Sequence, residues 1–140
     1  MSKVKRILSV IMAMVMVLAM SVPTFAATKD TATITVDNAG SATLTYAQVI
    51  KADQSTKTGW NFVNTAVAQA YMTAFGVADA QAAIEAMIPA ENVDANKLGA
   101  AQASAANSVT FGTMTNPQNV DAAGVYLVKA TEAGYTYNLM

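Results

Sequence analysis

The stretch Val125-Tyr-Leu-Val-Lys-Ala130 decides the fold class of this 140-residue chain. Its β-branched and aromatic residues predict a strand. Glu132-Ala-Gly134 predicts a turn directly after it, and Tyr135-Thr-Tyr-Asn-Leu-Met140 predicts a further strand. Because the sequence closes on apolar residues inside that strand, without a polar tail, we expect the chain to be a piece of a longer protein that is truncated at its C-terminus.

The N-terminal part of the chain predicts further strands. Thr and apolar residues alternate at 31–37, a second extended run covers 42–52, and 60–63 is a short apolar segment that fits a strand or the lead into a helix. Both faces of 42–52 are mixed, so its buried face stays open. Alternation returns at 108–114, and 115–124 predicts a long polar loop.

Between these strands, residues 64–106 are rich in alanine, the best helix former. Asn64 or Thr65, Asp79 and Asp94 are candidate N-caps for three short helices. Such helices bury little area each, so we expect them to pack on a sheet. The fold class is therefore α+β: a β-rich, sandwich-like domain with an Ala-rich helical insertion between early and late strands.

The composition excludes several classes of function. The chain has no Cys and no His, which removes disulfides, thiolate metal sites and His-dependent catalysis. We therefore expect no enzyme, no cofactor and no metal. Beyond residue 26, five Lys and nine carboxylates give a net charge of −4 (5 − 9), because three of the eight cationic residues precede that point. A domain with this negative charge is expected to bind nucleic acids poorly.

The first 26 residues predict a cleavable signal peptide. A basic start precedes a 16-residue apolar run at 7–22, which Pro23 ends, and small residues follow. The cut is expected after Ala26 or Ala27. An uncleaved anchor is the alternative, but the run is shorter than the ~20 residues that span a bilayer. We expect a signal helix that contacts the membrane only during export, and an exported domain over 27–140 at the cell wall, the cell surface or outside the cell.

Two segments carry a resemblance to a known family. They are Leu44-Thr-Tyr-Ala-Gln-Val-Ile-Lys-Ala-Asp53 and Ala123-Gly-Val-Tyr-Leu-Val-Lys-Ala-Thr-Glu-Ala-Gly-Tyr-Thr-Tyr-Asn138. Together with the leader, Trp60 and the Ala-rich middle, their order resembles the N-terminal domain of Gram-positive, sortase-assembled fimbrial (pilin) subunits. The likeness covers nearly the whole exported part. The order of the pieces is more specific than any single motif.

The resemblance implies a secreted structural protein of the cell wall that works in cell adhesion. Its partners would be other pilin subunits and sortase, both through C-terminal regions that this chain lacks, then peptidoglycan, and a host or surface ligand. Many such domains carry a Lys–Asn isopeptide bond. Lys51 is the candidate isopeptide lysine. In related repeats the assisting acid stands where this chain has Ala130, and the nearest acid here is Glu132.

Each candidate also has a plainer interpretation. Lys51 fits a solvated strand lysine, Glu132 a turn carboxylate, and Lys129 an edge-strand charge. The run 53–59 alternates like a calcium loop, but Lys57 falls where an oxygen ligand is needed. Four aromatic residues suit core packing, or a sugar-stacking surface in the alternative function, a free secreted carbohydrate- or ligand-binding module. They are Trp60, Phe62, Tyr135 and Tyr137.

Overall fold

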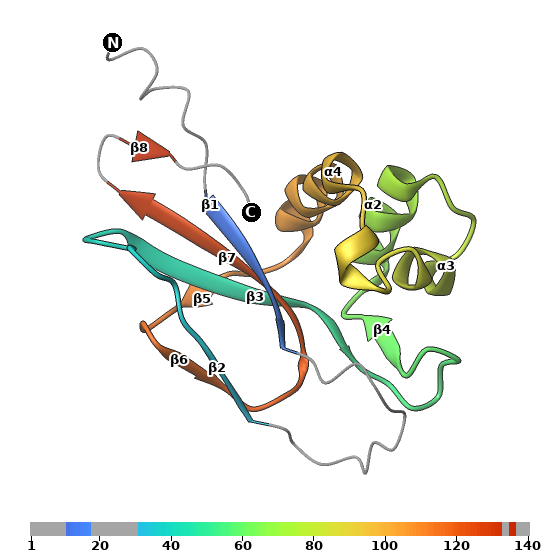
Figure 1. The fold of residues 1–140 in the computed structure, drawn as a ribbon, viewed down its shortest axis with the longest axis horizontal. Helices are drawn as coiled ribbons and strands as arrows, with labels where there is room; N and C mark the ends of the chain where they lie inside the picture. Colours follow the sequence, from blue (N-terminus) through green and yellow to red (C-terminus); the bar gives the residue numbers. More distant parts are fainter. Residues whose placement is uncertain (1–10, 18–30, 133–134, 137–140) are drawn as a thin grey trace.

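The computed structural model describes the backbone of residues 11–17, 31–132 and 135–136, with side chains over 31–132. Figure 1 shows the elements in chain order. They are β1 (Ile11–Val17), β2 (Ala32–Ile34), β3 (Thr43–Ala52), β4 (Trp60–Phe62), α2 (Thr65–Phe75), α3 (Ala80–Glu85), α4 (Ala95–Ala105), β5 (Gly112–Thr113), β6 (Gln118–Val120), β7 (Gly124–Glu132) and β8 (Tyr135–Thr136). Short 3₁₀ turns cover Ala90–Asn92 and Ala106–Ser108.

The two longest strands, β3 and β7, form the centre of the main sheet. They pair antiparallel from Thr43 opposite Thr131 to Lys51 opposite Gly124. The sheet runs β1-β7-β3-β4, with β5 added to β3 and β8 to β7, while β2 and β6 form a separate antiparallel pair. The predicted mixture of helices and strands is confirmed, with 33% helix and 29% strand in antiparallel sheets, but strand does not predominate as the β-rich prediction expected. The helices lie between the early and late strands, as expected.

A β-bulge in β3 explains why its sequence shows no clean alternation. Gln48 lies opposite Tyr126, yet Ile50 lies opposite Val125, so Val49 is an extra residue in β3. A bulge reverses which face the following residues occupy. Val49 and Ile50 consequently join the same apolar cluster, although neighbours on a regular strand point to opposite faces.

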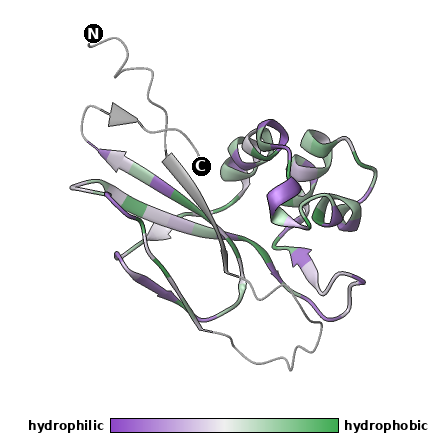
Figure 2. Ribbon diagram, viewed as in Figure 1, coloured by the Kyte–Doolittle hydropathy of each residue, from purple (hydrophilic) through white to green (hydrophobic). Residues whose placement is uncertain are grey.

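Successive residues of β7 feed two apolar clusters on opposite faces of the sheet. Val125 and Leu127 pack with the helices, whereas Tyr126, Val128 and Ala130 pack with β2 and β6. In Figure 1 the helices gather on one side of the main sheet and β2–β6 on the other. Figure 2 shows the apolar stretches of β3, β7 and the helices that supply both clusters. We call them the helix-side cluster and the strand-side cluster.

The three predicted helices form with the predicted caps. The side chains of Asn64, Asp79 and Asp94 each accept a backbone N–H from the first turn of α2, α3 and α4. Such caps satisfy amides that the helix itself leaves unpaired. At the end of α2, Gly76 adopts φ 69°, a left-handed conformation that glycine takes without a steric penalty. Side-chain capping and alanine content therefore gave reliable helix boundaries.

Several strand predictions differ from the structure. The run 31–37 is a strand only over β2, and 108–114 only over β5. The predicted loop 115–124 contains β6, whose Gln118-Asn-Val120 sequence looks like a turn but pairs with β2. β7 is not an edge strand, because β1 and β3 flank it, so Lys129 is not an edge charge in this chain. Pairing with distant strands determines which residues of these segments form strands, and local sequence propensity does not contain that information.

Of the predicted signal segment, residues 1–10 and 18–26 lie outside the described residues. The remaining part, Ile11–Val17, forms β1 and pairs antiparallel with β7. Because most of this segment is not described, the expected signal helix stays a prediction. Among residues 11–17, 31–132 and 135–136, no helix combines the length and apolar character that a bilayer span needs.

Candidate functional site

An amine, a carboxylate and a carboxamide lie near one another at the loop that joins β3 to β4. Lys51 lies directly opposite Asn61 in the antiparallel register of the two strands. The Nδ2 of Asn61 donates a 3.0 Å hydrogen bond to Oδ2 of Asp53. We call Lys51, Asp53 and Asn61 the Lys51 cluster. These are the three residue types that a Lys–Asn amide with an assisting acid requires.

The carboxylate of Asp53 organises the loop between β3 and β4. Its Oδ1 accepts the backbone N–H of Ser55 at 3.0 Å and the Ser55 hydroxyl at 2.6 Å. Hydrogen bonds from Ser55 and Asn61, with a smaller contribution from the charge of Lys51, hold the pKa of Asp53 below its usual value. The contribution of the Asp53 carboxylate to the stability of the fold is therefore complete above the usual pKa of Asp. It is lost as the pH falls through the lowered pKa.

The same bonds explain how 53–59 forms a turn. The oxygens of Asp53 accept from Ser55 in the loop and from Asn61 of β4, and its backbone N–H donates to the carbonyl of Gly59 at 2.8 Å. Over the described ranges, no three acidic side chains gather where they could share a metal ion. The alternation of polar residues in 53–59 therefore reflects turn formation.

Lys51 itself is exposed to solvent. An amine attacks a carboxamide only in its neutral form, and burial is what favours that form in proteins. The structure therefore brings a lysine, an asparagine and an acid together, but in a hydrated setting. In this setting the Lys51 ammonium acts as a charge beside Asp53.

The structure does not bring Glu132 to Lys51. Lys51 lies opposite Gly124 at the start of β7, and Glu132 is the last residue of that strand. Eight residues of extended chain separate these points by roughly 27 Å. Glu132 instead accepts a 2.7 Å hydrogen bond from the hydroxyl of Ser41. It cannot assist chemistry at Lys51, and Asp53 is the acid nearest to that role.

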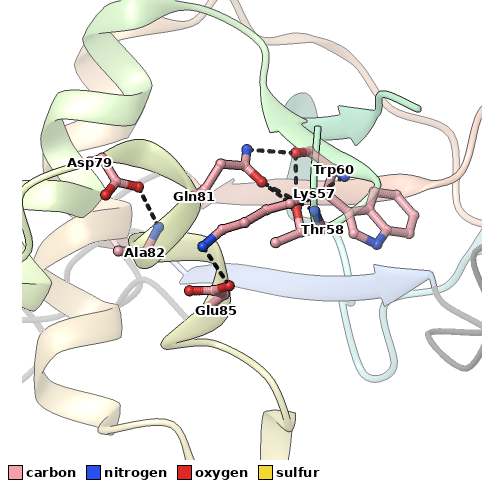
Figure 3. A network of polar contacts seen from close by, with 7 residues as sticks. All are labelled: Lys57, Thr58, Trp60, Asp79, Gln81, Ala82 and Glu85. Carbon is pink, nitrogen blue, oxygen red and sulfur yellow. Dashed lines mark hydrogen bonds and ion pairs between the residues drawn. The ribbon is translucent and has the colours of Figure 1, made fainter. Parts of the chain in front are cut away.

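A second polar network joins the same loop to α3 (Figure 3). Oε1 of Gln81 accepts the Thr58 hydroxyl at 2.6 Å, and its Nε2 donates to the carbonyl of Trp60 at 3.0 Å. Lys57 and Glu85 form an exposed ion pair at 2.9 Å beside it. We call the Gln81 contacts the Gln81 clamp. They fix β4 and its loop against the helical layer.

Sequence reasoning missed both Asn61 and Gln81. A signal existed for Asn61: a hairpin closed by the polar loop 53–59 places residues 51 and 61 opposite each other. No comparable signal exists for Gln81, because its partners, the Thr58 hydroxyl and the Trp60 carbonyl, lie 23 and 21 residues away in the sequence.

The aromatic residues at this end of the sheet are core residues. Trp60 is 5% exposed and Phe62 is 4% exposed, and Phe62 packs on Tyr71 with ring centroids 5.0 Å apart. Neither ring is available to stack on a sugar. The side chains of Tyr135 and Tyr137 lie outside the described residues. Core packing is thus confirmed for Trp60 and Phe62.

A shallow groove lies between α2 and α4. Its volume is about 350 Å³, and its walls are mainly alanine side chains with Gln69, Thr73 and Ser104. Such small side chains offer little to hold a ligand in one orientation, because pockets that do so combine aromatic walls with placed polar groups. The groove marks the close packing of two Ala-rich helices.

Comparison with known proteins returned no relative. No family model matches the chain, and neither a curated protein nor a solved structure matches it. Function therefore has to be inferred from the residues of the chain itself.

Proposed function

We propose that this chain is the N-terminal part of a structural subunit of a fimbria, pilus or adhesin on the surface of a Gram-positive bacterium. It works by assembly and adhesion and turns over no substrate. In this proposal, 27–140 is one exported, sandwich-like domain, with the β2–β6 pair packed across the main sheet. Sortase and neighbouring subunits act on regions of the full protein beyond this chain, and peptidoglycan is the final attachment.

One observation supports the proposal most. The two segments that carry the family resemblance, 44–53 and 123–138, lie far apart in the sequence; the first covers β3 except Thr43, and the second covers the whole of β7, its central partner. A resemblance built from chance matches has no reason to fall on two strands that pair with each other. The matched residues are thus those on which the sheet is built.

The use of polar side chains also favours a structural role. Asp53 and Asn61 close a loop, Gln81 joins a helix to a strand, and Glu132 holds Ser41. These groups connect elements to each other, which is what a domain without disulfides needs when it works outside the cell.

The proposal is tested by following the product of the native gene in its own bacterium. We expect the protein in the cell-wall fraction, as a series of high-mass species that survive boiling in SDS, because sortase joins subunits by amide bonds. Deleting the neighbouring sortase gene should collapse the series to one short species. A single species free in the medium, unchanged by the deletion, would contradict the pilin proposal and favour the secreted binding module.

A further inference from the structure

The outer edge of β7, on the side away from β3, is covered by residues that the proposed function removes. Along this edge β1 pairs with 124–130, from Val17 opposite Gly124 to Ile11 opposite Ala130. Because β1 belongs to the predicted signal peptide, cleavage takes away one neighbour of a long central strand (Figure 1). A strand edge that lacks a neighbour readily pairs with a strand of another chain, since its N–H and C=O groups need partners.

Alternate residues of β7 direct their backbone groups to this edge. In β3, the carbonyl of Leu44 accepts the N–H of Met114 on the side away from β7, so the next residue, Thr45, directs its own groups to β7. Thr45 lies opposite Lys129, whose N–H and C=O therefore point to β3. The even-numbered residues of β7 consequently point to the outer edge. Along 124–130 these are Gly124, Tyr126, Val128 and Ala130.

The edge that β1 covers has two definite ends. At one end, β8 pairs with Thr131 and Glu132 and so closes the edge beyond Ala130. At the other end, β7 itself begins at Gly124. The edge between them is as long as the seven-residue strand β1, and Leu127 lies at its centre. We call 124–130 the β7 edge.

The β7 edge is complementary to a second copy of itself. Two copies that run antiparallel about a two-fold axis at Leu127 cover the whole edge on both chains, with Gly124 of one opposite Ala130 of the other. In this register Tyr126 lies opposite Val128 of the second copy. Both residues direct their N–H and C=O groups outward, as a hydrogen-bonded pair in an antiparallel ladder requires.

The side chains that this register brings together are compatible. Tyr126 and Val128 both lie on the face of the strand-side cluster, and an aromatic residue opposite a β-branched one stabilises a sheet. Leu127 meets Leu127 of the second copy on the face of the helix-side cluster. Lys129 lies opposite Val125, so the two ammonium groups stand four residues apart, about 13 Å along the strand. The register therefore places no like charges opposite each other along the β7 edge.

We propose that the β7 edge is a dimer interface: after the leader strand is removed, two copies of the chain pair their β7 strands antiparallel along 124–130. The two main sheets then form one continuous sheet, because directly opposite residues share a face. The uncleaved chain stays monomeric, because Ile11–Val17 covers the β7 edge. The dimer joins two subunits side by side, in addition to their covalent joining by sortase. The inference rests on the signal-peptide cleavage in the proposed function.

Light scattering coupled to size-exclusion chromatography compares the masses of the two forms in solution. We expect the full chain, purified from the cytoplasm, to have the mass of one copy. The processed chain, collected after secretion, should have twice its own sequence mass. A processed chain that is monomeric at every concentration measured overturns the inference. The N-terminal mass of the secreted chain separately reports cleavage, so a failed export proposal is distinguishable from a failed dimer.

Engineered cysteines identify the register, and the natural chain has no Cys to interfere. In Val125→Cys/Lys129→Cys each thiol lies opposite the other kind in the second copy, with Cα atoms about 4.5–5.5 Å apart, within the range that a disulfide spans. Under oxidised glutathione the processed double variant should run as a disulfide-linked dimer, and the full chain should stay reduced. The single variants are the matched controls, because about 13 Å separates their two thiols. The inference is overturned if the processed double variant stays reduced, or if the single variants crosslink equally well.

A full-length variant tests the dimer even where the leader stays uncleaved. Val15 lies opposite Tyr126, so its N–H points to β7. Met14→Pro with Val15→Pro removes this donor and its neighbour and so expels the leader strand from the sheet. Added to the double cysteine variant, these changes should let the uncleaved chain form the disulfide-linked dimer. An uncleaved chain that stays reduced with the leader expelled also overturns the inference.

Discussion

At Gly124, β7 approaches β3 so closely that an added Cβ atom would overlap the carbonyl oxygen of Ile50 and lie 2.5 Å from Nε2 of Gln48. The backbone oxygen cannot move aside without disturbing the ladder. We expect Gly124→Ala to lower the free energy of unfolding by about 1–3 kcal/mol, measured by urea unfolding. Gly112→Ala, where an added Cβ meets nothing within 4 Å, is the control and should change little.

The buried hydroxyl of Tyr71 allows a second prediction about stability. Its ring is fully buried, and its hydroxyl has no hydrogen-bond partner among the side chains and backbone that the structure describes. Removing an unpaired buried hydroxyl while keeping the ring should be neutral or stabilising, by up to about 1–3 kcal/mol for Tyr71→Phe. Urea unfolding of the two proteins at pH 7 checks this. A clear loss of stability in Tyr71→Phe would mean that the hydroxyl does have a partner.

Burial also raises the pKa of Tyr71 above its usual value of 10.0. The unfolded chain therefore releases this proton at a lower pH than the folded chain. The contribution of the Tyr71 hydroxyl to the free energy of unfolding is therefore unchanged below about pH 10, and it becomes less favourable as the pH rises above that value. We expect the stability difference between Tyr71→Phe and the natural protein to grow in favour of the variant above that pH.

The intact mass of the chain tests whether Lys51 forms an amide bond. Because its amine is exposed, we expect no amide with Asn61, and the intact mass of the folded chain should equal the sequence mass. Condensation of the two side chains would release ammonia, a loss of about 17 Da. A species lighter by that amount, and absent in Lys51→Ala, would overturn this expectation and identify the Lys51 cluster as reactive.

At the scale of the element, the attachment of α3 depends on the Gln81 clamp. Gln81→Ala removes two partly buried hydrogen bonds, the one to the Trp60 carbonyl and the one from the Thr58 hydroxyl, so we expect a loss of about 1–2 kcal/mol in urea unfolding. Lys57→Ala removes the neighbouring exposed ion pair and should have little effect. Equal effects of the two substitutions would contradict the clamp.

The sequence was informative where structure is local. Asn64, Asp79 and Asp94 cap the helices they were expected to cap, and 125–130 forms the strand that it predicted. The sequence did not predict features that depend on pairing between distant residues. β6 exists because β2 pairs with it, and the distance between Lys51 and Glu132 follows from the direction of β7 relative to β3.

At the scale of the whole molecule, the two apolar clusters share the strands β3 and β7, so we expect them to unfold together. Val128 lies in the strand-side cluster and Trp60 in the helix-side cluster. Val128→Ala should cost about 2 kcal/mol, and it should lower the urea midpoint reported by Trp60 fluorescence as much as the midpoint reported by circular dichroism. Separate midpoints would show that each face of the sheet unfolds independently.

The extra residue at Val49 also limits how this gene can change. Upstream of it, even-numbered positions of β3 face β2 and β6; downstream, the assignment is reversed. Loss of the Val49 codon would restore a regular strand with Lys51 still opposite Gly124, but it would remove a fully buried side chain from the helix-side cluster. Loss of a codon between Leu44 and Gln48 would shift Leu44 by one position and turn it away from the strand-side cluster. Insertions and deletions in this protein should therefore accumulate in the polar connections, and the ten residues of β3 should keep their length.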